Sequence, residues 1–284
     1  MAQQRLGRVQ WGDLQFGPGT PYAVTGIEGL DDLPEIRGED VERPGQHGDY
    51  SGPDYTGARV VQLKLGMRAD SPDELRALTL ALRNATQPQR QPQPLQFLDQ
   101  GVLVWGKIRK RSLPYDAEYL WRIGDAALEI YCPDPYLYGL EERSASTTAY
   151  SPSAGRSYPL TYPRSYGSAG SSGRLTAVNE GASPAYPVLR IDGPVASPAI
   201  EQVNTGSILT LDATLQAGEY LLIDTRSRAV LLMGSSPRRS WVRAGSVWPL
   251  LQPGSNEIAY RGSALPGAPG QTSLLTVTWR DTSL

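Results

Sequence analysis

Apolar and polar residues alternate over much of this chain, which predicts short β-strands. From Val61 to Met67 every second residue is large and apolar, the pattern of a strand with one buried face. We expect further strands at 95–98, 102–108 and 126–132, the first two joined as a hairpin by the turn Asp99-Gln-Gly101.

One segment carries a helical signature. Ser71 is placed to cap a helix, Pro72 suits its first position, and Glu74 completes a capping box. Leucines then recur at helical spacing, and a proline-rich tract at 87–94 ends the pattern. The sequence therefore predicts a helix over 72–85 within an α+β domain, a sheet or sandwich, spanning about residues 1–140.

The last third of the chain predicts only strands. Apolar runs are separated by turn residues every 8 to 12 positions, which is typical of an all-β sandwich from about 175 to 284. The intervening segment 141–174 is rich in serine, glycine and tyrosine, and we expect a partly docked connection there. We expect seven strands and no helix in the sandwich, at 187–191, 199–203, 207–211, 220–223, 229–233, 256–260 and 274–279.

Histidine and cysteine are almost absent, which excludes several kinds of active site. His47 lies in a glycine- and proline-containing loop that gives a catalytic base little support, and Cys132 is expected in the core. One cysteine cannot form an intrachain disulfide, and no set of zinc ligands exists. The glycine-rich stretch 167–173 precedes no helix, so no phosphate loop is expected. We expect no metal, no cofactor and no catalytic residues, although a glycan-cleaving pair of carboxylates stays open because its spacing is spatial.

The overall charge gives no case for nucleic-acid or membrane binding. The net charge is −2, so sequence-specific nucleic-acid binding is not expected. No apolar run reaches the 18 residues of a membrane span, and Met1 to Arg5 lead into no signal-peptide core. We expect synthesis and folding in a reducing cytoplasm.

Two segments carry opposite local charges. Residues 30–54 hold eight acidic and two basic residues, whereas residues 83–111 hold six basic residues and one acid. The two segments are either separate solvated surfaces, or the acidic segment is an arm that lies on the basic hairpin of a neighbouring subunit and fixes register by charge. The candidate subunit interface consists of Asp31, Asp32 and Glu35 on the arm and Arg109, Lys110 and Arg111 on the hairpin.

The order of several motifs resembles the siphophage distal tail protein (Dit) family over nearly the whole chain. The strand Arg59–Gly66 precedes the capped helix, and Asp134-Pro-Tyr-Leu-Tyr138 is similar to the family's ending of its first domain. The later stretches that carry the resemblance are Asn179–Gly181, Pro187–Gly193, Asn204–Gly206, Ala217–Thr225, Leu250–Asn256 and Thr276–Arg280.

This resemblance implies a structural protein of the virion. It implies a homohexameric ring of N-terminal domains with an extended arm at about 30–54, and galectin-like jelly-roll sandwiches that project outward. The ring would be a baseplate hub at the tail tip, assembled in the bacterial host cytoplasm. The implied partners are the tail tube protein, the tape measure protein, a tail-tip protein and, in some phages, a fibre or receptor-binding protein.

A carbohydrate-binding module is the alternative for the sandwich. Tryptophan rings stack on sugars, and Trp241 and Trp248 are the candidate contacts with a host wall glycan. A galectin-like fold does not by itself bring sugar binding, so this function depends on exposed rings.

Overall fold

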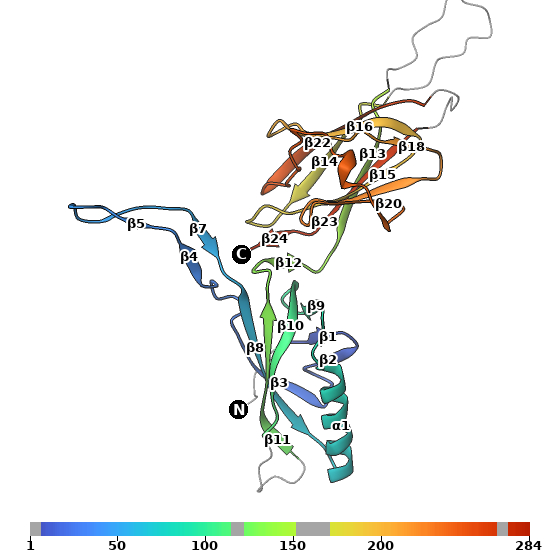
Figure 1. The fold of residues 1–284 in the computed structure, drawn as a ribbon. Helices are drawn as coiled ribbons and strands as arrows, with labels where there is room; N and C mark the ends of the chain where they lie inside the picture. The colour runs from blue at the N-terminus through green and yellow to red at the C-terminus, as the bar shows by residue number, and fades with distance from the viewer. Residues whose placement is uncertain (1–6, 115–121, 152–170, 266–271) are drawn as a thin grey trace, which may run out of the picture. The chain divides into compact units, whose positions relative to one another are not determined.

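The structure is a computed structural model that describes residues 7–114, 122–151, 171–265 and 272–284. The chain divides into two compact units, one reaching Leu140 together with Leu284, the other spanning 141–283. Both units are built mainly of strands, and each is described separately below (Figure 1).

Unit 1 is built on one sheet with the strand order β2-β1-β9-β10-β11-β8-β3, and β12 pairs with β10. All neighbours along this path are antiparallel. The strands are β1 (Val9–Trp11), β2 (Leu14–Phe16), β3 (Tyr22–Glu28), β8 (Arg59–Arg68), β9 (Gln93–Phe97), β10 (Val102–Ser112), β11 (Arg122–Cys132) and β12 (Leu137–Gly139).

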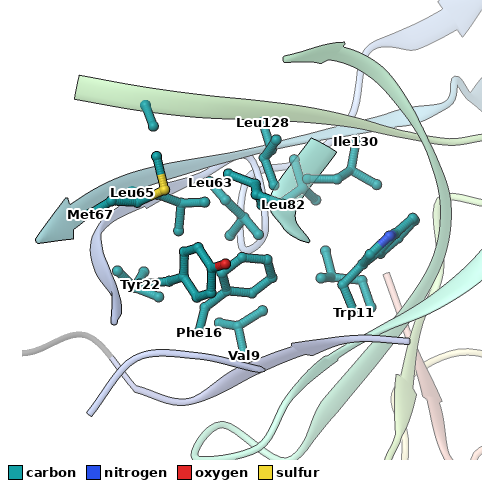
Figure 2. Close-up of a cluster of buried hydrophobic side chains, with 14 of the residues drawn as sticks. Val9, Trp11, Phe16, Tyr22, Leu63, Leu65, Met67, Leu82, Leu128 and Ile130 are labelled. Atoms are coloured by element: carbon teal, nitrogen blue, oxygen red, sulfur yellow. The ribbon is translucent and has the colours of Figure 1, made fainter. Parts of the chain in front are cut away.

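Strand β8 shows why the alternation in the sequence produces this sheet. Its odd-numbered side chains from Arg59 to Met67 are buried, and nearly all its even-numbered side chains are exposed. Leu63 pairs with Leu128 of β11 on one side and with Ile27 of β3 on the other. The buried side chains form the core of unit 1, together with residues of β1, β2 and the helix (Figure 2).

The helix α1 (Pro72–Ala85) begins where the sequence predicts it. The Ser71 hydroxyl accepts a hydrogen bond from the Glu74 N–H at 3.2 Å, and the Glu74 carboxylate accepts one from the Asp70 N–H. Leu75 and Leu82 are buried against the sheet, and the Trp11 indole donates to the Ala85 carbonyl at 3.1 Å. The helix therefore packs on the core that the strands of unit 1 form.

The two ends of the sheet path are also tied together. The Gly17 N–H donates to the Tyr22 carbonyl at 2.7 Å, and the rings of Phe16 and Tyr22 meet edge to face at 5.8 Å. Gly17 has a φ of 113°, and an added Cβ would lie 2.8 Å from the Gly7 carbonyl oxygen. Glycine is therefore required where the chain crosses from β2 to β3.

Residues 30–57 form a separate two-stranded ribbon between β3 and β8 (Figure 1). Its inner pair joins β4 (Ile36–Gly38) to β7 (Asp54–Thr56), and its outer pair joins β5 (Val41–Glu42) to β6 (Asp49–Tyr50). We call this segment the ribbon.

Unit 2 is a sandwich of two antiparallel sheets around a second core (Figure 1). The first sheet contains β13 (Arg143–Thr148), β23 (Leu274–Trp279), β15 (Val188–Asp192), β19 (Tyr220–Asp224), β20 (Ala229–Leu232) and β21 (Ser236–Pro237). The second contains β14 (Arg174–Asn179), β22 (Gly254–Ser263), β16 (Val195–Gln202), β17 (Ser207–Thr210) and β18 (Thr214–Leu215), and the remaining elements are η1 (Arg239–Trp241) and β24 (Thr282–Ser283).

The fold class predicted from the sequence is confirmed, and the helix over 72–85 is confirmed at both ends. Three details of the prediction were wrong. The sandwich has more than seven strands, it contains the 3₁₀ turn η1, and part of the expected connection 141–174 belongs to it. Arg143–Thr148 pairs along its whole length with β23, although its small polar residues give no strong strand pattern. Residues 152–170 of the expected connection lie outside the described residues.

We expect the buried and exposed leucines of α1 to differ sharply in their effect on unit 1. Leu82→Ala should lower the free energy of unfolding by about 2–5 kcal/mol because it leaves a cavity against the sheet. Leu80 is 57% exposed, so Leu80→Ala should change it by at most about 0.5 kcal/mol. Hydrogen exchange of β8 peptides measures the free energy of unfolding for unit 1 alone. Equal effects of the two substitutions would contradict the placement of α1.

Candidate assembly surface

The ribbon exposes an unusual number of large apolar side chains. Among its described residues only Leu30 and Pro34 are buried, and both lie at its base. Five large apolar side chains are about half exposed or more: Leu33 (63%), Ile36 (49%), Val41 (62%), Tyr50 (57%) and Tyr55 (55%). Fully burying such a side chain contributes about 1.5–3 kcal/mol, so the ribbon has much to gain from a partner surface.

The ribbon has no core of its own beyond this base. A two-stranded hairpin is at best marginally stable in water without a further layer. Val41 pairs with Tyr50 across the outer strands, so two exposed apolar side chains lie side by side there. This arrangement fits a segment that becomes ordered against another surface.

The charges of the ribbon indicate what that surface must supply. Glu42 lies directly opposite Asp49, a like-charged pair that destabilises an isolated ribbon. The guanidinium of Arg43 lies 4.9 Å from the centre of the Tyr50 ring near the tip, where His47 is exposed. Cations on a partner surface would offset the repulsion between Glu42 and Asp49, and apolar area on it would cover the exposed apolar side chains of the ribbon.

The base of the ribbon is held by a buried arginine. Arg59, the first residue of β8, is only 2% exposed. Its Nη1 donates to the carbonyls of Gly29 (3.2 Å), Leu30 (2.5 Å) and Asp32 (2.6 Å) at the start of the ribbon, and its Nε donates to Pro135 (2.9 Å) after β11. One side chain thus joins three segments of unit 1.

Arg59 keeps its charge in this position. Burial lowers the pKa of the guanidinium, and the nearby carboxylates of Asp31 and Asp32 act in the opposite direction. Because an arginine stays protonated even after a sizeable decrease, the carbonyl oxygens receive charge-assisted hydrogen bonds. Arg59 is not among the residues predicted from the sequence, although its place in the buried alternation of β8 was the available signal.

The predicted acidic interface residues lie along the base of the ribbon. Asp31, Asp32 and Glu35 are all exposed, and the Asp32 carbonyl accepts from Arg59. The Glu35 carbonyl accepts from the Gly57 N–H at 2.6 Å, which holds the two chains of the ribbon together. Their side chains are therefore accessible to a partner.

The predicted basic residues differ in their contacts within unit 1. Arg109 and Lys110 are exposed, and the Arg109 guanidinium lies 4.5 Å from the centre of the Tyr131 ring. Arg111 instead bonds the carbonyls of Arg83 (3.0 Å) and Thr86 (3.3 Å) and the Thr86 hydroxyl (2.7 Å). It stabilises the carboxyl end of α1, where a cation is favourable, so its main role is within unit 1.

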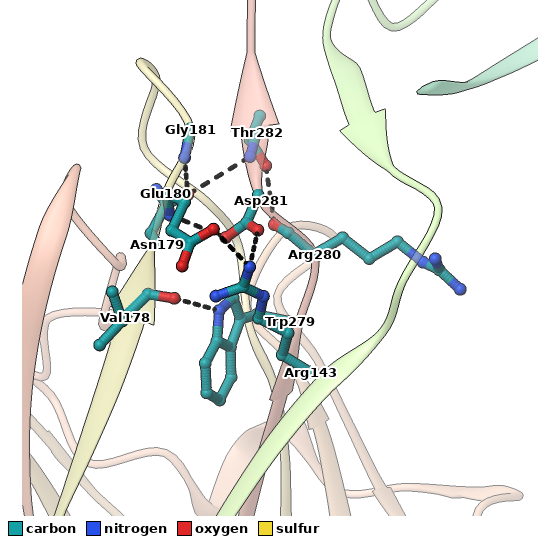
Figure 3. A network of polar contacts seen from close by, with 9 residues as sticks. All are labelled: Arg143, Val178, Asn179, Glu180, Gly181, Trp279, Arg280, Asp281 and Thr282. Atoms are coloured by element: carbon teal, nitrogen blue, oxygen red, sulfur yellow. Dashed lines mark hydrogen bonds and ion pairs between the residues drawn. The ribbon is translucent and has the colours of Figure 1, made fainter. Parts of the chain in front are cut away.

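In unit 2, residues from the stretches that resemble the family hold main-chain segments together by hydrogen bonds. The Asn179 amide nitrogen donates to the carbonyls of Ser183 and Leu251. The Asn179 side-chain oxygen accepts from the N–H groups of Gly181 and Thr282 (Figure 3). The Trp279 indole donates to the Val178 carbonyl at 2.9 Å. These contacts join β14 to the end of the chain.

A cation at the same place completes this network. Arg143 Nη2 lies 2.6 Å from Glu180 Oε2 and 2.9 Å from Asp281 Oδ2 (Figure 3). Its hydrogen bond lowers the pKa of the Glu180 carboxyl. These contacts join the start of β13 to the segment after β14 and to the end of the chain.

The candidate glycan contacts are only partly accessible. Trp241 and Trp248 are partly buried and pack against the core of unit 2. The guanidinium of Arg238 lies 5.5 Å from the centre of the Trp241 ring, and that of Arg239 lies 5.6 Å from the Trp248 ring. Much of each ring is therefore already in contact, and glycan binding by these two residues stays a prediction.

Other chemistry has little support within the part of the chain that the structure describes. Cys132 is buried, and burial raises the pKa of its thiol to about 12, so it is a poor nucleophile. No cluster of histidine, cysteine or carboxylate side chains could hold a metal ion there. None of the described helices has the length and apolar character needed to cross a membrane.

Comparisons with known proteins agree with this picture. The family model of the siphovirus-type tail component, C-terminal domain, matches residues 180–281. The structure is similar to the crystal structure of the Dit protein of phage SPP1, described as a paradigm of the hub adsorption apparatus in phages that infect Gram-positive bacteria. The TM-score is 0.64 at 15% identity over 93% of this chain and 94% of that chain.

Two structures of the phage p2 baseplate in its activated conformation share the fold as well. The structure with Ca matches with a TM-score of 0.52 at 11% identity, and the structure with Sr matches with 0.51 at 10%. Each covers 95% of this chain and 96% of the other. A search of the curated proteins found no match.

We expect Arg59 to control the order of the ribbon. Arg59→Met removes four hydrogen bonds and leaves carbonyl oxygens buried without donors, so it should destabilise unit 1 by about 3 kcal/mol or more. Hydrogen exchange of peptides spanning 29–36 should accelerate more than that of α1. Arg37→Met, which changes an exposed arginine of the ribbon, is the control. Unchanged exchange at 29–36 in the Arg59 variant would contradict this role.

Proposed function

We propose that the protein is a distal tail protein that builds the hub of a phage tail. The proposal rests on the match of residues 180–281, in the second unit, to the siphovirus-type tail component family. The resemblance to the distal tail protein family predicted from the sequence is confirmed, and the fold matches that of the SPP1 protein over 93% of this chain. The protein is a structural component of the virion tail and has no catalytic role in this proposal.

The ribbon is the observation that carries this proposal. It exposes apolar side chains next to acidic ones on a segment without its own core. A subunit of a closed ring can bury such a segment on its neighbour. A ring also gives every ribbon the same partner surface, so no apolar surface is left over.

The ring is a homohexamer, with unit 1 forming the ring and unit 2 an accessory β-sandwich of galectin-like type. Its position is the distal end of the tail tube, where the hub joins the tube to the tail tip. The partners are the tail tube protein, the tape measure protein, a tail-tip protein and a fibre or receptor-binding protein. The hub acts by geometry, since it presents fixed surfaces to each partner.

The ribbon of one subunit lies on the β10–β11 hairpin of the next in this proposal. The acidic ribbon and the cations Arg109 and Lys110 attract each other and set the register of the contact. The apolar side chains, led by Val41 and Tyr50, supply the affinity. Arg111 is left out of this contact because it holds the end of α1.

We expect the purified protein to form a particle of six copies. Six chains of 30.8 kDa give about 185 kDa, and electron images should show a ring with a central opening. Light scattering coupled to size exclusion measures the mass. Val41→Ser combined with Tyr50→Ser should shift the protein toward monomers because it removes apolar area from the contact.

The control removes similar apolar area elsewhere. Leu80 (57% exposed) and Val247 (52% exposed) lie outside the ribbon, so Leu80→Ser with Val247→Ser should leave the mass unchanged. Reversal of Arg109 and Lys110 to glutamate should weaken the ring and reduce its sensitivity to salt. A wild-type protein that stays monomeric at high concentration, or a ring that both ribbon and hairpin variants leave intact, would contradict the proposal.

A further inference from the structure

One face of the sheet of unit 1 is turned away from the core and from α1. The odd-numbered residues of β8 are in the core, so Val60, Gln62 and Lys64 are on the opposite side of the sheet. The register places Tyr131 of β11 beside Val60, and it places Lys107 of β10 beside Tyr131. We call this side of β8, β11 and β10 the open face.

The open face carries exposed apolar area. Trp105 precedes Lys107 by two residues on β10, so both side chains are on this face. Trp105 is 39% exposed and Val60 is 43% exposed. Tyr131 is the direct neighbour of Val60 and the diagonal neighbour of Trp105 in the register. The three side chains therefore form one apolar patch across three strands.

Cations surround this patch. The chain has only three lysines, Lys64, Lys107 and Lys110, and the register places all three on the open face. Lys64 already has a carboxylate partner, and the Lys107 ammonium donates to a main-chain carbonyl. Arg109 and Lys110 form no ion pair within the described part of the chain, although Glu129 lies opposite Lys110. The open face thus offers apolar area together with available positive charge.

The tip of the ribbon has the complementary composition. Val41 pairs with Tyr50, and Glu42 pairs with Asp49 at the next position. Because successive residues of a strand point to opposite sides, the apolar pair and the acidic pair are on opposite faces of the tip. The apolar face can pack on a flat apolar surface, while long lysine and arginine side chains of that surface reach the carboxylates around the ribbon's edges.

The tip and the open face do not cover each other within one chain. Val41 (62%) and Tyr50 (57%) are exposed in the same chain in which Val60 and Trp105 are exposed. The ribbon has the length to cover the patch of another copy. Residues 36–42 span at most about 20 Å, and β8 and β10 are two strand spacings apart, about 10 Å.

The pairing of two unlike surfaces also decides the kind of assembly. A contact between the tip of one copy and the open face of the next is heterologous, and repeated contacts of this kind close a ring when the rotation fits. A contact of tip with tip would instead give a two-fold dimer and leave both open faces uncovered. The two surfaces of this chain therefore fit a second copy of the same chain in head-to-tail order.

We propose that the open face of one copy receives the ribbon tip of the next, with the apolar face of the tip packed on Val60 and Trp105 beside Tyr131. Trp105 is the anchor of the contact, and Arg109 and Lys110 attract the acidic edges of the ribbon. This inference rests on the proposed ring and adds the surface on which each ribbon docks and the face of the ribbon that it buries.

Crosslinking between two full-length variants tests this docking. One variant carries Ser51→Cys, next to Tyr50 of the tip, and the other carries Gln62→Cys on the open face. Both positions are exposed, whereas the native Cys132 is buried, so a short bis-maleimide reacts with the engineered thiols. Copies mixed while dissociated and then assembled together should give crosslinked dimers. Each variant alone should give almost none, because the contact joins unlike surfaces.

The matched control moves the second thiol to the other side of the sheet. Asn84 is exposed near the end of α1, so Asn84→Cys mixed with Ser51→Cys should give no more dimer than the single variants. Trp105→Ala should raise the protein concentration at which half of the chains are assembled by at least about tenfold. Leu80→Ala, at an exposed position of α1, should leave that concentration unchanged.

The outcomes separate this inference from the proposed function. A six-copy ring in which Ser51→Cys crosslinks to Asn84→Cys instead of Gln62→Cys would overturn the docking site and leave the hub standing. A ring that Trp105→Ala does not weaken would overturn it as well, since another partner would then cover the open face. A wild-type protein that stays monomeric would contradict the hub proposal and the docking with it. Should Trp105→Ala destabilise unit 1, the Gln62→Cys crosslink decides, because it leaves every side chain of the contact in place.

Discussion

The buried guanidinium of Arg59 is the interaction on which the arrangement of unit 1 depends. It replaces a hydrophobic side chain at the first inward position of β8 and offers its hydrogens to main-chain carbonyls from two directions. Those carbonyls belong to the base of the ribbon and to the segment that ends the first unit. Because a buried charge must keep its hydrogen bonds, both segments are fixed against β8.

This constraint explains how a ribbon without a core can serve assembly. Beyond its base, the large apolar side chains of the ribbon are about half exposed or more and contribute little to the stability of the subunit, so the direction of the ribbon has to be set at its base. A ribbon that leaves the sheet at a fixed position needs less ordering when it meets a neighbour, which strengthens the contact.

The sequence was sufficient for the elements with regular patterns and insufficient for those held by long-range contacts. The helix from Pro72 and the strand β8 follow from capping residues and strict alternation. Strand β13 contains serines and threonines, and only its pairing with β23 makes it a strand. Three neighbouring cations, Arg109, Lys110 and Arg111, look alike in the sequence. Nothing there indicates that Arg111 bonds the Thr86 carbonyl at the end of α1, 25 residues earlier in the chain. Arg59 could be recognised only because it lies on the same face of β8 as Val61 and Leu63, at alternate positions of the strand.

The most direct test of this account is an electron cryo-microscopy map of the assembled particle at a resolution that shows side chains. The account predicts a closed ring in which Val41 and Tyr50 of each ribbon are buried on the neighbouring copy, with Arg59 still bound to the carbonyls at the ribbon's base. A ring whose ribbons remain exposed to solvent, or whose subunits meet without them, would contradict it.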